Sequence, residues 1–183
     1  MIEKISHEIN IRMINKNDIS RIDKRFIEQG WTSRLDTLNN YYNEQQIGKR
    51  IVLIAEINKD IAGYVTLLKV AKHGPFAGNY PEVADFNVFK GYQKQGIGNR
   101  LLERVEQEAS KFSETITLGV GMHKGYGSAQ RLYIKRGYIP DGTGVWYNNK
   151  NIEINEPCSN NDDLAIYLSK VFDTSSDRFI HSF

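Results

Sequence analysis

The chain has 183 residues, of which 40% are hydrophobic and 25% charged, a composition typical of a soluble globular protein with one sizeable core. Its 24 basic and 22 acidic residues give a net charge of +2, which gives no support to a nucleic-acid or membrane-surface partner. The single cysteine, Cys158, excludes an intramolecular disulfide bond, and the N-terminal segment lacks the apolar run of a signal peptide or membrane span. We therefore expect a cytoplasmic protein.

The first half of the chain mixes strand and helix patterns. Residues 8–14 predict a strand, and residues 18–46 predict two polar helices that are separated at Gly30. The segment from Asn15 to Asp18 offers turn and capping residues for the first helix, and Ser33 is the expected cap of the second. Three further strands are expected, the first two of them joined as a hairpin by a turn at residues 58–60: residues 50–57, 61–71 and 82–89.

The second half begins with an amphipathic helix. Its apolar stripe is Ile97, Leu101, Leu102, Val105, Ala109 and Phe112. The polar face opposite is Arg100, Glu103, Arg104, Glu106 and Gln107. A strand at 115–122, a short helix at 128–136 that stops at Gly137, further short strands around GYIP and VWYNN, and a last strand at 164–172 complete the pattern. This order predicts a mixed α/β fold on a mainly antiparallel sheet.

Two glycines stand where the amphipathic helix begins, in the sequence QKQGIGN. Glycine weakens a helix by roughly 1 kcal/mol relative to alanine, so Gly96 and Gly98 need a reason. A helix start presents unpaired N–H groups and the positive end of the helix dipole, and glycine lets a large phosphate approach the backbone. The segment therefore predicts a phosphate or pyrophosphate cradle, and the alternative is a tight turn without a ligand.

Two nucleotide-binding motifs do not fit this segment. A P-loop needs Lys and Ser or Thr after its second glycine, where this chain has Ile97 and Gly98. A dinucleotide fingerprint needs a third glycine, where this chain has Leu101.

The pattern that fits is Gln-x-x-Gly-x-Gly between a strand and a helix, and here the sequence resembles the GNAT superfamily of N-acetyltransferases. A second segment, AQRLYIKRGY at residues 129–138, resembles the family's Ala-x-x-Leu-Tyr-x-x-x-Gly-[Phe/Tyr] pattern. The order of predicted elements follows the family from residue 8 to about 172. The resemblance implies one GNAT domain over residues 1–183, with a central sheet of about seven strands and about four flanking helices.

The resemblance also implies acetyl-CoA as cosubstrate, without a metal. The pyrophosphate would bind the turn that starts at Gln93, on the amides of Lys94, Gln95, Gly96, Ile97, Gly98 and Asn99. The pantetheine arm would pair like an extra strand with Phe86, Asn87 and Val88. The four histidines (His7, His73, His123 and His181) are scattered singly, and none has a Cys or His partner at metal-ligand spacing.

Acetyl transfer needs a neutral amine, a polarised carbonyl and a proton for the leaving thiolate. Tyr133 matches the family's general acid; plain packing on the sheet is the alternative. Glu82, eleven residues before Gln93, is the candidate base, with Asp85 on the opposite strand face and ordered water as alternatives.

One position departs from the family, because Tyr126 stands where an asparagine often contacts the cofactor arm. Ser128 is the expected substitute for that contact.

The resemblance implies an amine acceptor, whose identity no motif indicates. Six aromatic residues are candidates for lining its pocket, although each also fits core or loop packing: Trp31, Tyr41, Tyr42, Phe76, Tyr80 and Trp146. A homodimer is also possible in such folds. The alternative function is a non-catalytic acyl-CoA-binding or regulatory module, and a nucleotide-binding protein comes third.

Overall fold

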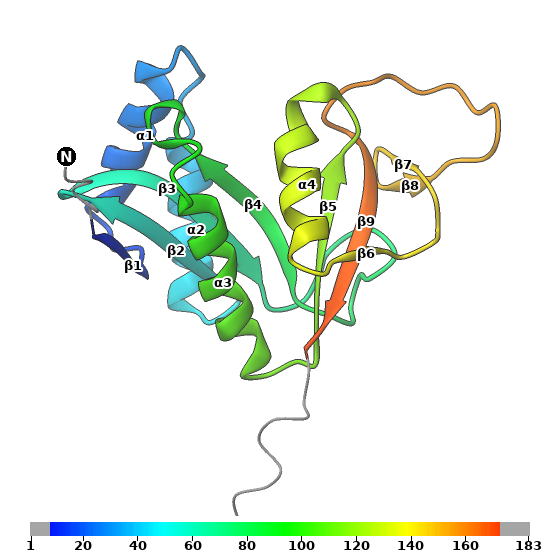
Figure 1. The fold of residues 1–183 in the computed structure, drawn as a ribbon, viewed down its shortest axis with the longest axis horizontal. Coiled ribbons are helices and arrows are strands. Elements are labelled where there is room, and N and C mark those ends of the chain that lie inside the picture. The colour runs from blue at the N-terminus through cyan, green and yellow to red at the C-terminus, as the bar shows by residue number, and fades with distance from the viewer. Residues whose placement is uncertain (1–7, 173–183) are drawn as a thin grey trace, which may run out of the picture. The chain divides into compact units, whose positions relative to one another are not determined.

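The structure is a computed structural model that describes residues 8–172, and it has a mixed α/β architecture (Figure 1). The sheet runs in the order β1-β2-β3-β4-β5-β9-β7-β8, and β6 also pairs with β9. In chain order the helices and strands are β1 (Ile9–Met13), α1 (Asp18–Glu28), α2 (Leu35–Gln46), β2 (Arg50–Ile57), β3 (Asp60–Leu68), β4 (Glu82–Val88), α3 (Ile97–Ser110), β5 (Thr115–Gly121), α4 (Gly127–Lys135), β6 (Ile139–Pro140), β7 (Trp146–Tyr147), β8 (Lys150–Asn151) and β9 (Leu164–Val171). Two short 3-10 helices, η1 (Lys90–Tyr92) and η2 (Lys124–Tyr126), precede α3 and α4.

The expected fold class is confirmed. Within residues 8–172 the model has four α-helices, and the strand pairs β1–β2, β2–β3 and β5–β9 are antiparallel, whereas β4 and β5 are parallel. Within the described residues the sheet contains nine strands rather than about seven. The count includes β6, β7 and β8, which have only two residues each. No helix of the described chain is both long and apolar enough to cross a membrane.

The start of α2 differs from the expectation. Ser33 was expected to cap this helix, but α2 begins at Leu35 and Arg34 takes the cap position without a side-chain cap bond. The Ser33 hydroxyl still accepts the Leu35 N–H at 3.4 Å, and it donates to the carboxylate of Asp23 at 2.9 Å. Ser33 therefore lies one position before the cap residue of α2, and its hydroxyl links the α1–α2 connection to Asp23 of α1.

The described residues fall into two compact units. The first contains the chain up to Leu68 together with Ala84–Val105, and the second contains Lys69–Val83 and the chain from Glu106 onward. Strand β4 and helix α3 therefore each contribute residues to both units.

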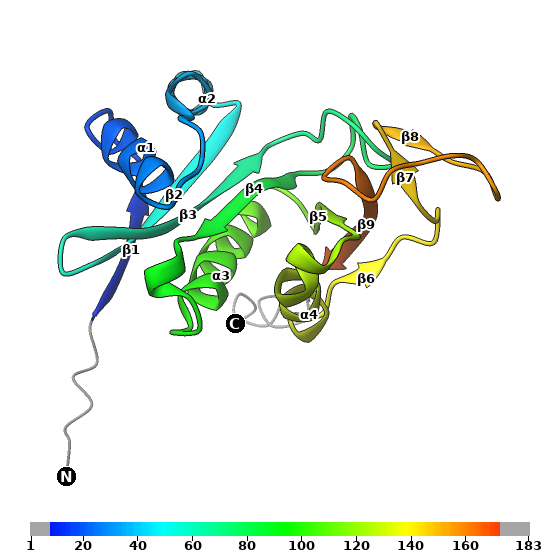
Figure 2. The same ribbon diagram turned by 90° about the horizontal axis from the view of Figure 1, so that it is seen from above.

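The first unit packs α1 and α2 on one face of its strands, and the start of α3 lies on the other face (Figure 2). A buried cluster that includes Ile22, Leu38, Ile54 and Phe89 forms this core. Asp18, at the start of α1, is fully buried, and Arg12 of β1 reaches it with two hydrogen bonds of 2.6 and 2.9 Å. These bonds lower the pKa of Asp18 against the opposing effect of burial.

The second unit contains a buried carboxylate that the helix pattern did not predict. The periodicity places Glu106 on the polar face of α3, yet Glu106 is 6% exposed. Arg136 donates to both of its oxygens, at 2.8 and 2.6 Å, and Lys170 of β9 donates at 2.8 Å. Phe112 shows the reverse error, because it was assigned to the buried stripe and is 46% exposed just beyond the end of α3. A buried ion cluster thus replaces apolar packing at the end of this helix.

We expect Glu106→Gln to lower the free energy of unfolding by about 3 kcal/mol, because the substitution removes the buried charge that Arg136 and Lys170 share as an ion-pair partner. Urea unfolding at pH 7 measures this loss. Glu103→Gln, at an exposed position of the same helix, is the control and should cost less than about 0.5 kcal/mol.

The pH dependence of the difference gives a second check. Burial alone would raise the pKa of Glu106, but the hydrogen bonds from Arg136 and Lys170 lower it below 4.5. Its stabilising contribution is therefore complete above the ordinary glutamate pKa and is lost as the pH falls through the lowered value. A difference between the two proteins that stayed constant down to pH 2 would contradict this assignment.

Candidate active site

The glycine turn connects η1 to α3 and exposes its backbone. Lys94 and Gly96 have positive φ angles of 61° and 83°, and both residues, like Gln95 between them, are exposed. The N–H groups of these three residues make no hydrogen bond with any residue from 8 to 172. The turn therefore offers three open backbone donors where α3 begins, and the dipole of α3 favours an anion there.

Two side chains of the motif hold this turn in place through hydrogen bonds to its backbone. The Gln93 amide donates to the Val88 carbonyl at 3.0 Å, and the Gln95 amide donates to the Gly91 carbonyl at 3.1 Å. Ile97, the first residue of α3, is 1% exposed and anchors the helix in the core. The motif glutamines thus fix the loop, which leaves its N–H groups for a ligand.

Gly96 is required by its backbone angle rather than by lack of space. A Cβ atom added there would meet no atom within 4 Å, but φ = 83° lies in the region that L-residues rarely adopt. The empty space above Gly96 also leaves room for a phosphate next to the backbone.

Strand β4 presents half-buried residues before the turn. Phe86, Asn87 and Val88 are all intermediate in exposure. The parallel register with β5 joins Glu82 to Thr117 and Val83 to Leu118. Phe86 to Val88 lie beyond these two pairs.

Glu82 lies at the start of β4, half-buried, and Tyr167 of β9 lies close enough to respond to its charge. Burial, and then the carboxylates of Glu82 and Asp141, raise the pKa of Tyr167. The Tyr167 ring fits against two glycines, since a Cβ on Gly74 would come within 2.3 Å of it and one on Gly119 within 3.2 Å. The sequence did not single out Tyr167, because an aromatic residue in a strand is typical of ordinary sheet packing.

Tyr133 lies in the middle of α4 and is 5% exposed. Its ring meets the ring of Tyr138 edge-on, at 5.8 Å between centroids. Burial and the neighbouring Glu106 carboxylate raise the pKa of Tyr138. Tyr133 is therefore held in the packed second unit, on a helix that Arg136 ties to Glu106.

Asp85, the rival base, lies in a hydrogen-bonded cluster of the first unit. Its Oδ2 atom accepts from the hydroxyls of Tyr64 at 2.9 Å and Tyr41 at 3.1 Å, and it pairs with Arg34 Nη1 at 2.9 Å. Burial, and then the Asp85 charge, raise the pKa of Tyr41 to about 12 and also raise the pKa of Tyr64 well above its ordinary value. The Oδ2 atom of Asp85 therefore already has three donors.

Tyr126, which departs from the family pattern, belongs to a separate cluster at the end of β5. Its hydroxyl donates to Asp162 Oδ1 at 3.0 Å, and His123 Nε2 lies 2.9 Å from the same oxygen. Because His123 Nδ1 accepts the Gly125 N–H at 3.0 Å, the proton of the neutral ring lies on Nε2. Gly121 makes room for the tyrosine, since a Cβ there would lie 2.3 Å from the Tyr126 ring.

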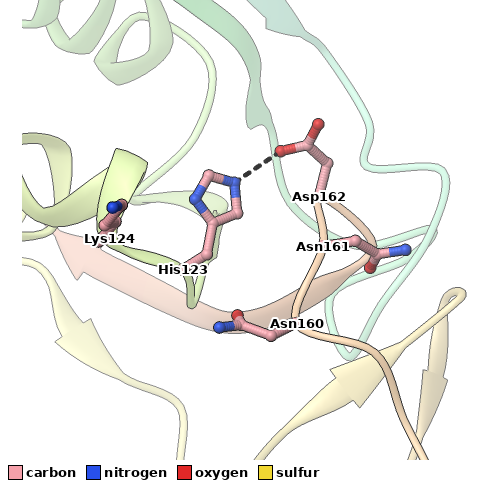
Figure 3. A pocket seen from close by; sticks show the side chains of 5 residues that line it. All are labelled: His123, Lys124, Asn160, Asn161 and Asp162. Atoms are coloured by element: carbon pink, nitrogen blue, oxygen red, sulfur yellow. Dashed lines mark hydrogen bonds and ion pairs between the residues drawn. The ribbon is translucent and has the colours of Figure 1, made fainter.

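This cluster borders a shallow hollow of about 500 Å³ in the second unit. Figure 3 shows His123 and Lys124 on one side of it and the segment from Asn160 to Asp162 on the other. Ser128, the expected substitute contact, is exposed in the first turn of α4.

The six aromatic candidates divide between the units. In the first unit, Trp31 stacks on Phe26 at 5.4 Å, Tyr41 bonds Asp85, and Tyr42 packs on the core. In the second unit the contacts are ring pairs: Phe76 with Tyr80 at 6.2 Å, and Trp146 with Tyr167 at 5.5 Å. Each of the six therefore has a packing contact of its own.

In residues 8–172 no three His, Cys, Asp or Glu side chains are grouped so that they could bind a metal ion. Two of the four histidines, His7 and His181, lie outside the described residues.

A model of the acetyltransferase (GNAT) family matches residues 17–138 of the chain. The chain belongs to this family. The match includes both the glycine turn and the segment with Tyr133, so this GNAT protein is an acyltransferase, as the sequence predicted. No curated protein sequence matches it.

Solved structures confirm the fold of this acetyltransferase. Ribosomal-protein-alanine N-acetyltransferase from Brucella melitensis is 15% identical, with a TM-score of 0.67 over 89% of this chain and 99% of that one. The Salmonella typhimurium acetyltransferase yncA, whose structure includes its cofactor acetyl-CoA, is 18% identical, with a TM-score of 0.64 over 92% and 96%. A GNAT acetyltransferase from Staphylococcus aureus is 20% identical, with a TM-score of 0.63 over 90% and 99%.

We expect Gly96→Ala to destabilise the acetyltransferase by about 1–2 kcal/mol, because alanine must adopt the left-handed backbone angle of this position. Urea unfolding measures the cost. Gly91→Ala is the matched control, since Gly91 lies in η1, just before the turn, in open space and without a positive φ angle. Equal stability of the two variants would show that the turn does not depend on the conformation of Gly96.

Proposed function

We propose that this acetyltransferase transfers the acetyl group of acetyl-CoA to a primary amine by direct attack in a ternary complex. The observation that carries the proposal is the turn at residues 94–96. Its N–H groups are open, the space above Gly96 is empty, and it stands at the start of a helix in a chain of the GNAT family. The acetyl-CoA in the yncA structure supports the same cosubstrate here.

The turn would bind the pyrophosphate of acetyl-CoA. Lys94, Gln95 and Gly96 would donate their N–H groups, joined by those of Ile97, Gly98 and Asn99 in the first turn of α3. Gln93 would support the turn indirectly, because its side-chain amide holds the loop through a hydrogen bond to the Val88 carbonyl.

The pantetheine arm carries amides, so it suits a strand edge. Main-chain groups of Phe86, Asn87 and Val88 would pair with these amides, and Ser128 would supply a further polar contact. Because the contacts to the arm and to the phosphates are mostly made by main chain, most side chains of this region can vary.

In the proposed reaction the nitrogen of the neutral amine forms a bond to the thioester carbonyl carbon, and the carbon–sulfur bond then breaks. The proton lost by the amine goes to Glu82, directly or through water, and Tyr133 gives a proton to the departing CoA thiolate. The three donors that the Oδ2 atom of Asp85 already accepts argue against Asp85 as the base.

A covalent cysteine intermediate is not part of this proposal. Cys158 is exposed in the segment between β8 and β9, far along the chain from both motifs. We also propose that the whole chain works as one GNAT domain, since the family match continues through residues of both compact units.

Saturation with acetyl-CoA at about a hundred times Kd should add roughly 2.7 kcal/mol of stability, a rise in Tm of about 5–10 °C for a chain of this size. Differential scanning fluorimetry measures this, with ATP and NAD as controls that should produce no shift. CoA release over a panel of primary amines then tests transfer. Binding without release with any amine would favour a non-catalytic acyl-CoA-binding module, and a shift with ATP alone would overturn the cofactor.

Tyr133→Phe should lower kcat by about 100-fold or more while acetyl-CoA binding is unchanged, because a general acid contributes roughly 10²–10⁴. Tyr138→Phe is the matched control, since it removes the hydroxyl of the buried neighbour and should leave kcat intact.

Glu82→Gln should lower kcat/KM most at low pH, where the amine is protonated and a base is needed most. Full activity of Tyr133→Phe or Glu82→Gln at every pH would remove that residue from the mechanism.

A further inference from the structure

Among residues 8–172, Arg12 and Arg136 form contacts that use both oxygens of a carboxylate. Arg12 donates to both oxygens of Glu56 at 2.9 Å each and to both oxygens of Asp18, and Arg136 does the same with Glu106. This two-point geometry matches the shape of the two groups and gives the stronger contact. Other arginines pair through a single oxygen, as the buried Arg50 does with Glu44 at 2.6 Å.

Arg34 pairs differently. It meets Asp85 end-on, through Nη1 alone at 2.9 Å, and the same nitrogen donates to the Tyr64 hydroxyl at 2.8 Å. Its Nε and Nη2 atoms make no hydrogen bond with any described residue. The side chain is 29% exposed, so part of it is reached by solvent.

The guanidinium group of Arg34 is held firmly in place. Its Cζ lies 5.3 Å from the centroid of the Phe26 ring, which supports one face. Asp85, which orients the inner edge, is itself fixed by the hydroxyls of Tyr41 and Tyr64. A preorganised arginine loses less freedom when it binds an anion than a flexible surface arginine does.

Two elements of this cluster also carry residues of the proposed site. Asp85 belongs to β4, the strand that begins with Glu82 and continues to the proposed pantetheine contacts at Phe86 to Val88. Arg34 stands at the start of α2, and Tyr41, from the same helix, was a candidate for lining the acceptor pocket. The open edge of Arg34 has two parallel N–H donors, which match the two oxygens of a carboxylate.

We propose that Arg34 binds a carboxylate of the acceptor, so that the substrate class is amines that also carry a carboxylate, such as amino acids. Asp85, Tyr64 and Phe26 are the positioning residues of this contact. The proposal rests on the acetyltransferase function proposed above, and it names the acceptor class for it.

The test is isothermal titration calorimetry into the full-length protein saturated with CoA. The probes are matched pairs that differ only in the carboxylate: alanine with ethylamine, ornithine with putrescine, and lysine with cadaverine. In at least one pair we expect the amino acid to bind 10- to 100-fold more tightly, the range for a charge-assisted hydrogen-bonded contact. The absence of such a preference in every pair overturns the proposal, and so does tighter binding of phosphoethanolamine than of its carboxylate counterpart β-alanine.

Two variants test whether the preference for the carboxylate-bearing probe depends on Arg34. Arg34→Gln should remove it, and Arg34→Lys, which keeps the charge near Asp85 but lacks the paired donors, should remove most of it. Arg25→Gln is the matched control, because Arg25 is 28% exposed, pairs with Asp60 and stacks on Tyr92, and its loss should leave the preference intact. A preference that survives in folded Arg34→Gln overturns the assignment. CoA release with the same probes tests the proposed function separately, because binding and transfer are measured independently.

Discussion

Strand β4 contributes residues to both compact units, and this constrains the rest of the molecule. Its first two residues, Glu82 and Val83, pair with β5, and its remaining residues belong with the strands and helices of the first unit. Because side chains alternate along a strand, Glu82 and Asp85 lie on opposite faces of the sheet. The two carboxylates therefore have different surroundings, and Asp85 orders a hydrogen-bonded cluster on its own face. The glycine turn follows directly, so that its orientation depends on how β4 ends.

Buried charge carries much of the organisation around this strand. Asp18 joins β1 to the start of α1, Glu106 joins α3 to α4 and β9, and Asp85 joins β4 to the α1–α2 connection. A buried carboxylate is costly unless it is paired and hydrogen-bonded, and Asp18, Glu106 and the partly buried Asp85 each accept from at least one arginine. The first two pairs use both carboxylate oxygens, whereas the third leaves the outer edge of the arginine unused.

Sequence patterns predicted the elements well where one physical signal dominated. Strand β2 begins and ends where its apolar run does, and Gly137, with a φ angle of 87°, follows the end of α4. The glycine turn was found because two glycines conflict with helix propensity. Periodicity failed at Glu106 and Phe112, because burial at the end of α3 depends on Arg136 and Lys170, which come 30 and 64 residues later. The Asp85 cluster could not be predicted for the same reason, since Arg34, Tyr41 and Tyr64 reach it from separate elements.

Tyr126 shows how the chain adapts to a residue that is unusual for the family. An asparagine side chain would leave space above β5, whereas the tyrosine ring needs the space that Gly121 provides. The hydroxyl then extends to Asp162, where it shares one oxygen with His123. Hydrogen bonds from these two side chains lower the pKa of Asp162, so the carboxylate stays charged and keeps both contacts at neutral pH. The tyrosine thus exchanges a contact that the family makes to the cofactor arm for one that attaches the segment before β9 to the end of β5. We therefore propose that the cofactor arm relies on the main chain of β4, the part of the proposed site that least depends on side-chain identity.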